Sequence, residues 1–218
     1  MQQRVRWFLI PLGLVLATAW LGCGGDKVPG PLAMDPDETE RWEIALVEWR
    51  IEKNEAFSDP QLSPLPNDVR EEFEGLDYYF PAAEFRYRLP LVASATADTV
   101  QLNLRKGETA AYVNRGQIRF RHGDQTCELT VYGSLQGNSD ALWLPFYDLT
   151  NGEDTYQGGR YLDLDLAADG TVEVDFNKAY NPLCAYDVER WNCVLPPAAN
   201  TVALRVEAGE KLLDGAKP

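Results

Sequence analysis

The stretch GGRYLDLDLAADGTVEVDFNKAYNPLCAYD, residues 158–187, decides the fold class. Leu alternates with Asp over residues 162–165, the chain turns at Asp169 and Gly170, and Val then alternates with acidic residues. Such alternation is typical of strands with one exposed face, and Asp-Gly is a strong hairpin signal. The hairpin is followed by a run of Asn, Tyr, Pro and Cys that no ordinary strand requires, so it is a candidate functional segment.

The same alternation recurs along the chain and predicts a mostly β fold of about eight short strands. Besides RYLDLDL and TVEVDF, the segments that carry it are FRYRL, TVQLNLRKG, QIRFRHG, CELTVYG, ALWLPFYDL and TVALRV. Short strands separated by turn residues indicate an antiparallel β-sandwich or barrel. One or two N-terminal helices, over residues 37–57 and 67–74, are expected to cover it.

The longer helix has a start signal at Asp35 and Asp37 and a broad apolar stripe. The stripe comprises Trp42, Leu46, Trp49 and Lys53, widened by Ile44, Val47 and Ile51, and the opposite face carries Glu43, Arg50 and Asn54. The two tryptophans are interpreted as core contacts against the sheet. A sugar-binding platform is the alternative interpretation.

Composition limits the class of protein. The chain has 218 residues, 45% hydrophobic and 25% charged, which fits one or at most two globular domains. Its formal net charge is −14, and no basic stripe is present. Nucleic-acid binding requires clustered Lys and Arg, so we expect no nucleic-acid partner.

The N-terminus is typical of an exported protein. Arg4 and Arg6 precede an apolar stretch over residues 7–20, which is too short to span a bilayer and fits a secretory signal. The junction Gly22-Cys23 resembles the lipobox of bacterial lipoproteins, with departures at Trp20 and Leu21. An ordinary cleavable signal is the alternative.

The lipobox resemblance implies a lipidated Cys23 and a membrane anchor. Residues 1–22 would be the signal peptide, residues 23–36 the lipidated Cys and a tether, and residues 37–218 a single β-rich domain. Because Gly24 rather than Asp follows the cysteine, the resemblance implies the outer membrane in a Gram-negative cell. In a Gram-positive cell it implies the cell surface.

An exported protein can form disulfides. Cys184 and Cys193 bracket the short loop AYDVERWN, and closing it would stabilise the fold by roughly 2.7 kcal/mol. Cys127 alternates with Leu129 and Val131 and is expected to be a buried thiol. No CxxC or HxxxH spacing occurs, and DLDLAADG has the wrong spacing for a calcium loop, so we expect no metal and no cofactor.

Polar groups concentrate in two segments, residues 144–163 and 174–187. The candidate ligand-binding residues there are Asp148, Thr150, Tyr156, Arg160, Tyr161, Asp175, Asn177, Tyr180, Asn181 and Tyr186. Gly158 and Gly159 allow a close approach or a positive φ, and Arg160 suits a carboxylate or phosphate. Two interpretations stay open: a cleft for a polar small molecule, glycan or peptide, or a buried network that holds the loops together.

Catalysis is the less favoured alternative. His122 is the single histidine, lies in a turn, and has no GxSxG partner motif, which argues against a Ser-His-Asp hydrolase. A hydrolase with paired carboxylates would draw on Asp148, Glu153 and Asp175.

A string of motifs covers nearly the whole chain after the tether. They are SPL (63–65), FEGLDYYFP (73–81), LPFYDLTNG (144–152), TYQGGRYL (155–162), DFNKAYNPLCAY (175–186), CVLPPAAN (193–200) and AGEK (208–211). This pattern resembles the bacterial domain-of-unknown-function family sixteen-eighty-four, with a departure at Leu183 where Pro is expected. The resemblance implies no activity, ligand or cofactor. We therefore interpret the chain as an envelope lipoprotein with a non-catalytic binding or envelope-associated module, and a purely structural envelope protein is a further alternative.

Overall fold

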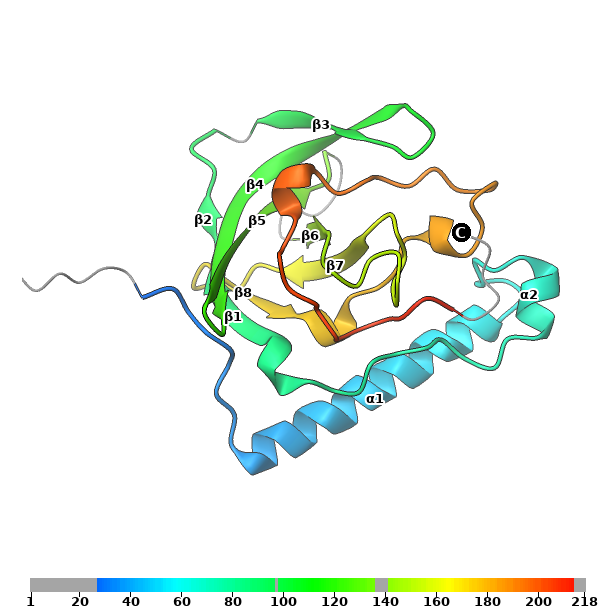
Figure 1. Ribbon diagram of the computed structural model, residues 1–218, viewed down its shortest axis with the longest axis horizontal. Coiled ribbons are helices and arrows are strands. Elements are labelled where there is room, and N and C mark those ends of the chain that lie inside the picture. The colour runs from blue at the N-terminus through cyan, green and yellow to red at the C-terminus, as the bar shows by residue number, and fades with distance from the viewer. Residues whose placement is uncertain (1–26, 97, 136–140, 214–218) are drawn as a thin grey trace, which may run out of the picture.

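A computed structural model of the chain describes residues 27–96, 98–135 and 141–213 (Figure 1). The expected signal peptide, residues 1–22, and the expected lipidation site, Cys23, lie outside these residues. None of the helices formed by the described residues is long and apolar enough to cross a membrane. Within the expected tether, Pro29 and Leu32 already contact the fold: Arg121 N donates to Pro29 O (2.7 Å) and Leu32 N to Arg86 O (2.7 Å).

Helix α1 spans Pro36–Ser58 and begins where the sequence predicts. A capping box explains the start: Glu38 N donates to Asp35 Oδ1 (2.8 Å) and Asp35 N to Glu38 Oε2 (3.0 Å). The shorter helix α2 spans Asn67–Glu71, with Glu72 as its C-cap in place of Gly75, so the prediction of a helix to residue 74 was too long.

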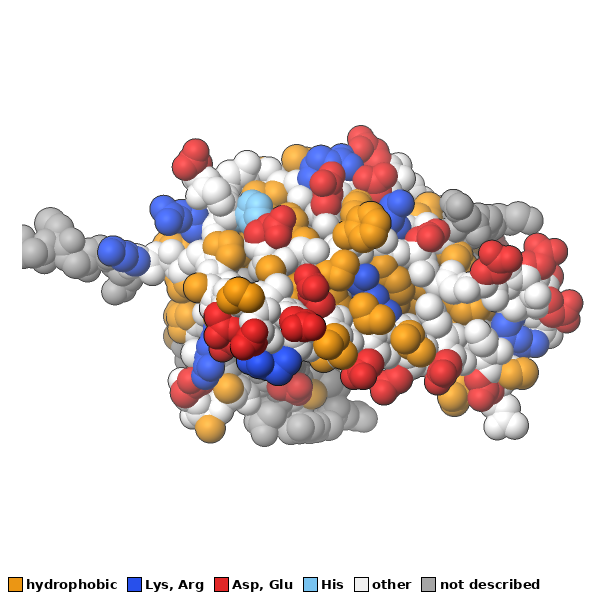
Figure 2. Space-filling model, turned by 90° about the horizontal axis from the view of Figure 1, so that it is seen from below, with side chains coloured by type: hydrophobic (Ala, Val, Ile, Leu, Met, Phe, Trp, Pro, Cys, Tyr) orange, Lys and Arg blue, Asp and Glu red, His pale blue; other side chains and the backbone are white. Residues whose placement is uncertain are grey.

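The apolar stripe of α1 is narrower than predicted. Trp42, Leu46 and Phe57 are buried, whereas Ile44, Val47 and Ile51 are 52%, 46% and 52% exposed. The prediction of a broad apolar stripe on this helix was therefore wrong. Arg50 and Asn54, predicted for the outer face, instead make contacts: Arg50 Nη1 donates to Tyr79 O (3.0 Å), and Leu76 N donates to Asn54 Oδ1 (3.0 Å). Figure 2 shows the side of the molecule that carries α1, where apolar side chains are interspersed with acidic ones.

The strands form two antiparallel sheets, which confirms the mostly β fold with eight strands. In the first sheet β1 (Arg86–Pro90) pairs with β8 (Thr171–Asp175). The second sheet has the order β2-β4-β5-β6-β7, with β3 also on β4. Its strands are β2 (Val92–Ala93), β3 (Thr99–Asn103), β4 (Thr109–His122), β5 (Gln125–Gly133), β6 (Ala141–Phe146) and β7 (Arg160–Asp165). The sheets do not close into a barrel, so the barrel alternative is set aside.

Strand β4 carries two partners on one edge, and Gly116 makes this possible. β2 pairs at Gly116 and Gln117, whereas β3 pairs over residues 109–113, and the register with β5 shifts between Asn114 and Gly116. Gly116 has φ +139°, and a Cβ there would lie 2.3 Å from Val92 O. Only glycine fits this bulge without moving β2. Strand β2 was not predicted, because two residues are too few to show a period.

The segment TVALRV is not a regular strand, contrary to the prediction. We call residues 201–211 the C-terminal strap. Its side chains alternate between exposed and buried, with Val202, Leu204 and Val206 in the core. Its backbone bonds to the rest of the fold are isolated and do not form a continuous ladder. Near its start, Val202 N donates to Tyr147 O (2.9 Å) and Leu149 N to Leu204 O (2.8 Å); near its end, Tyr79 N donates to Gly209 O (3.0 Å) and Glu210 N to Ala179 O (2.8 Å). In Figure 1 the strap, coloured red, passes between the sheets and α1.

The main core fills the space between the sheets and the strap. Its largest buried side chains include Tyr87, Phe120, Phe146, Phe176 and Leu144. Short 3₁₀ helices connect the later elements: η1 (Ala83–Phe85), η2 (Phe176–Lys178), η3 (Leu183–Ala185) and η4 (Ala198–Asn200). The predicted hairpin of residues 162–175 is only partly formed. The chain does turn at Asp169 and Gly170, but β7 pairs with β6 and β8 with β1, so the two strands belong to different sheets and meet only at an isolated bridge between Leu166 and Val172. The short helices η2 and η3 follow β8.

The burial of α1 predicts unequal effects of substitution on its two faces. Trp42 Nε1 donates to the buried Asp175 Oδ2 (2.8 Å). Trp42→Phe removes this donor to a carboxylate and is expected to lower the free energy of unfolding by roughly 1.5–3 kcal/mol. Ile44→Ala, on the exposed face, should change it by less than about 0.5 kcal/mol. Urea midpoints at unchanged slope measure both, and equal losses would contradict this assignment of faces.

Candidate functional site

Arg160, at the start of β7, is fully buried and organises the C-terminal strap. Its Nη2 donates to Asp148 Oδ2 (2.8 Å) and Val206 O (2.7 Å). Its Nη1 donates to Ala208 O (2.5 Å) and Glu210 O (3.2 Å). One guanidinium therefore takes the place of a strand partner for three strap carbonyls.

Asp148 extends this network into the loop between β6 and β7. Thr150 N donates to Asp148 Oδ1 (2.7 Å), and the hydroxyls of Thr150 and Thr155 are hydrogen-bonded to each other (2.9 Å). Asp148, Thr150 and Thr155 are all buried. This arrangement favours the buried-network interpretation of Arg160 and Asp148 over the ligand cleft.

Gly158 and Gly159 show the close approach and the positive φ that the sequence predicts for this pair. A Cβ at Gly158 would lie 2.4 Å from the Tyr156 ring. Gly159 has φ +86°, and a Cβ there would lie 2.6 Å from Pro196 Cγ. The close approach is thus to the protein's own side chains, and it brings Arg160 into the core.

Asp175 and Asn177 form a second network that attaches the N-terminal segments to the sheet. Asp175 accepts from Trp42 Nε1 and from the amide groups of Asn177, and it pairs with Arg86 Nε (3.3 Å). The Asn177 side chain bonds both backbone groups of Ala82, at 2.8 and 2.9 Å. These groups lock α1 and the segment before β1 in place.

A third network centres on Glu210, which the sequence argument did not single out. Its carboxylate is fully buried and accepts from Asn181 N (2.8 Å) and Tyr186 Oη (2.9 Å), and it pairs with Lys53 Nζ (2.5 Å). Burial and the Glu210 charge raise the pKa of Tyr186 well above its ordinary value, so its hydroxyl stays a neutral donor. The clue in the sequence was Lys53, a charged residue within the apolar stripe of the helix.

An open pocket lies beside these networks, between the second half of α1 and the face of β6 and β7 that points away from the main core. Its volume is about 920 Å³. The aromatic residues that line it are Trp49, Phe57, Tyr112, Trp143, Tyr161, Tyr180 and Trp191. The charged and amide residues are Glu52, Lys53, Asp163, Lys178, Asn181 and Asn192. Small-molecule sites are typically such apolar concavities with a few convergent polar groups.

The aromatic wall is rigidly packed. The Tyr112 and Trp143 rings stack with centroids 5.1 Å apart, and Tyr161 meets Trp143 edge to face at 4.7 Å. Tyr180 Oη donates to Asp163 Oδ1 (3.0 Å). Burial raises the pKa of Tyr180, with Asp163 adding to the effect, so this hydroxyl stays protonated. These contacts hold the rings in place before any ligand arrives.

Lys53 occupies the base of the pocket. Its ammonium lies 4.7 Å from the Tyr180 ring centroid, 5.4 Å from that of Trp49 and 5.8 Å from that of Phe57. Together with the Glu210 pair, this gives the ammonium a full set of cation–π and ionic contacts. The same residue thereby links the strap to α1 at the pocket.

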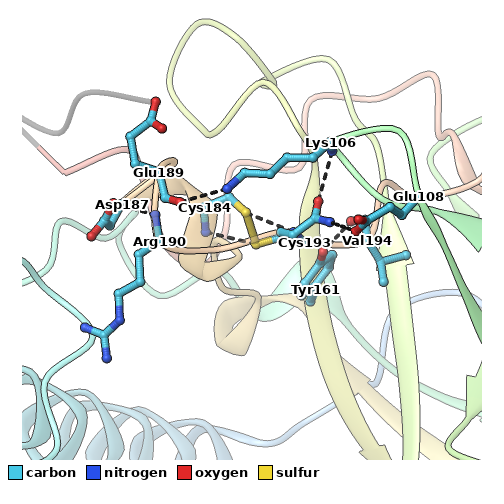
Figure 3. The surroundings of a disulfide bond; sticks show 10 residues. Lys106, Glu108, Tyr161, Cys184, Asp187, Glu189, Arg190, Cys193 and Val194 are labelled. Atoms are coloured by element: carbon cyan, nitrogen blue, oxygen red, sulfur yellow. Dashed lines mark hydrogen bonds between the residues drawn. A yellow bond between two sulfur atoms is a disulfide. The ribbon is translucent and has the colours of Figure 1, made fainter.

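A disulfide supports the far wall of the pocket. Cys184 and Cys193 are bonded, as predicted, and Cys127 is a buried free thiol. Figure 3 shows the neighbouring contacts: Tyr161 donates to Val194 O, and Lys106 Nζ to Glu189 O (2.7 Å). The segment of residues 191–194 is thus fixed to η3, to β7 and to the β3–β4 turn.

The ten predicted site residues divide between the pocket and the networks. Tyr161, Tyr180 and Asn181 line the pocket. Those that lie in buried positions away from its lining are Asp148, Thr150, Tyr156, Arg160, Asp175, Asn177 and Tyr186. The pocket residues that the prediction missed include Trp143 and Trp191, whose strand and loop positions carry no signal for a shared site. Trp49 was noted as a possible sugar platform, and it does line the pocket, whereas Trp42 is a core contact.

The acids considered for a hydrolase are separated from one another. Asp148 pairs with Arg160, Asp175 with Arg86, and Glu153 with Arg205 (2.7 Å), and none of the three lines the pocket. Among the described residues, no group of three or more His, Cys, Asp or Glu side chains could hold a metal ion.

Comparison with known proteins gives two findings. The family described as "Protein of unknown function (DUF1684)" matches residues 71–211. The solution NMR structure of an uncharacterized protein from Haloarcula marismortui is 35% identical with a TM-score of 0.64, covering 82% of this chain and 97% of that chain. The likeness therefore extends to an archaeon and is not confined to bacteria. None of the curated proteins compared with the chain matches it.

The Arg160 network predicts a large loss of stability on truncation. Arg160→Ala would leave Asp148 and the strap carbonyls buried without their donor, and we expect the free energy of unfolding to fall by roughly 3–5 kcal/mol. Arg160→Lys should also be destabilised, because one ammonium cannot reach all four acceptors. Arg119→Ala, which breaks an exposed pair with Glu128 (3.3 Å), is the matched control and should lose far less. Denaturant midpoints measure all three, and an Arg160→Ala protein as stable as its parent would refute the network.

Proposed function

The chain belongs to the DUF1684 family, and we propose that it is a non-catalytic binding module of the cell envelope that takes a small ligand in the aromatic pocket beside α1. The observation that carries this proposal is the pocket itself. Its volume of about 920 Å³ lies at the upper end of the range of roughly 300–1,000 Å³ that small-molecule sites occupy. Its aromatic walls are held by ring contacts and a disulfide, so binding would cost little ordering of side chains.

The lining residues favour binding over catalysis. The acids that a hydrolase would use, Asp148, Glu153 and Asp175, each pair with an arginine away from the pocket. The lining cysteine, Cys193, is oxidised to a disulfide. The two carboxylates of the lining are Asp163, which accepts from Tyr180 Oη (3.0 Å), and Glu52, which is exposed to solvent. The pocket therefore offers mainly rings and hydrogen-bonding groups.

The buried networks have a supporting role in this proposal. Arg160 holds the strap, the strap carries Glu210, and Glu210 binds Lys53 at the base of the pocket. The buried polar residues thus position the side chains that line the pocket and need not contact the ligand themselves.

The envelope location rests on the N-terminal sequence. We propose that the chain is exported, cut before Cys23 and anchored by lipid on that residue. Pro29 lies six positions after Cys23 and is already bonded to β4. Six residues span at most roughly 20 Å, so the anchor would hold the β-rich domain close to the membrane.

Cys23→Ser tests the anchor. Stable anchoring needs two or more acyl chains, and the variant has no thiol to carry them. We expect the variant protein to move from the membrane fraction to the soluble or secreted fraction, measured by immunoblotting of fractionated cells. A variant that stays in the membrane at the same length as the parent would rule out lipidation at Cys23.

The pocket is tested with a fragment library and ligand-observed NMR on the purified full-length protein. Trp49 lines the pocket and is only partly buried, so Trp49→Ala removes lining surface with little effect on the core and should abolish saturation transfer to the fragments that bind the parent. Phe80→Ala is the control, because Phe80 is 92% exposed and lies outside the lining. Fragments that bind the Trp49→Ala protein as well as the parent, or no binding at all, would contradict the proposal.

A further inference from the structure

The chemistry of the pocket lining discriminates between classes of ligand. We propose that its ligand is a neutral saccharide of more than one ring, an inference that rests on the proposed function.

A cationic ligand would meet the ammonium of Lys53. Aromatic pockets attract cations through the faces of their rings. Here that position is filled by Lys53 Nζ, which lies 4.7 Å from the Tyr180 centroid and 5.4 Å from that of Trp49. A second cation against these rings would be repelled by the first, so the protein's own lysine opposes quaternary ammonium and polyamine ligands.

An anionic ligand is disfavoured by the surrounding charge. Glu210 neutralises the charge of Lys53. The remaining charged residues of the lining are one cation, Lys178, and two carboxylates, Glu52 and Asp163. The whole chain carries a formal net charge of −14, which repels phosphates and carboxylates at longer range. A phosphorylated or acidic ligand would gain one ammonium and face two carboxylates.

A wholly apolar ligand, such as an acyl chain, would cover polar groups without bonding them. Asp163 and Lys178 belong to the lining, and Tyr180 bonds only one of the two carboxylate oxygens of Asp163. Covering the other oxygen or the Lys178 ammonium without supplying a partner is unfavourable. The ligand must therefore present both apolar surface for the rings and hydroxyl or amide groups for these side chains.

A sugar ring has this combination. Its C–H faces are apolar and flat enough to lie on Trp49 or Trp143, and its hydroxyls at the rim both donate and accept. The hydroxyls can donate to Asp163 and accept from Asn192 or Lys178. The pocket volume of about 920 Å³ has room for more than a single ring.

The test is a titration of the full-length protein with a panel of compounds. Binding is monitored by ligand-observed NMR in a buffer without sugar-based detergents. The neutral members of the panel are cellobiose, maltose and N,N′-diacetylchitobiose. The charged counterparts are the glucosamine disaccharide and digalacturonate, and uridine is a neutral compound that is not a simple sugar. We expect at least one neutral disaccharide to bind about ten-fold more tightly than its charged counterparts and uridine, a difference of about 1.4 kcal/mol.

Two variants locate the binding. Asp163→Ala removes an acceptor on the pocket side of β7 and should weaken the neutral disaccharide about ten-fold, the effect of losing one hydrogen bond to a charged group. Asp165→Ala, on the same strand but outside the lining, should leave its affinity unchanged. Thermal unfolding of both variants checks that the fold is retained, and Asn192→Ala serves as a second lining variant.

The outcomes separate this inference from the proposed function. If only charged compounds or uridine bind, and Trp49→Ala abolishes that binding, the saccharide class is wrong and the binding site stands. If fragments bind while no saccharide does, the saccharide class is again wrong. If neither fragments nor any member of the panel bind, both proposals fail. A disaccharide affinity that is equal in Asp163→Ala, Asn192→Ala and Asp165→Ala would overturn the assignment to this pocket.

Discussion

The buried guanidinium of Arg160 is the contact on which the rest of the structure depends. It bonds Asp148 and the carbonyls of Val206, Ala208 and Glu210. These carbonyls lie in the core, where an unpaired backbone group is costly. The strap has only isolated backbone bonds to its neighbours, and the arginine satisfies its other buried carbonyls because it supplies several donors from one planar group.

The pocket follows from the position of the strap. Glu210, at its end, binds Lys53 of α1 on one side and Asn181 and Tyr186 on the other. Helix α1 and the segment after β8 are thereby held apart at a set distance, with the outer face of β6 and β7 between them. The buried ion pairs do no chemistry in this account. They place aromatic side chains from distant segments around one pocket. Substitutions that disrupt these ion pairs should therefore alter ligand binding indirectly, by moving the aromatic side chains.

The disulfide and the Gly158-Gly159 pair serve the same purpose at the other wall. Cys184–Cys193 closes a short loop that carries Trp191 and Asn192 into the lining. Gly159 allows Pro196 to approach β7 closely, so the segment after the loop lies flat on the sheet. Exposed apolar residues on α1, such as Ile44 and Ile51, take no part in either wall and mark the side of the helix that faces away from the fold.

The sequence by itself determined the mostly β class, the start of α1 and most strand positions. These depend on local periodicity and on a capping box whose partners are three residues apart. It also singled out Arg160 and the disulfide pair, since their residue types restrict what they can do.

Only the tertiary structure decided which polar groups form networks and which surround a pocket. The lining draws on α1, β4, β6, β7 and two loops, and Glu210 meets Lys53 across most of the length of the chain. The strap shows why alternation alone was misleading. Its side chains alternate because one face meets the core, and that pattern is the same whether the backbone is bonded by a strand or by an arginine. Periodicity reports burial, whereas the partners of buried polar groups depend on contacts that no local pattern records.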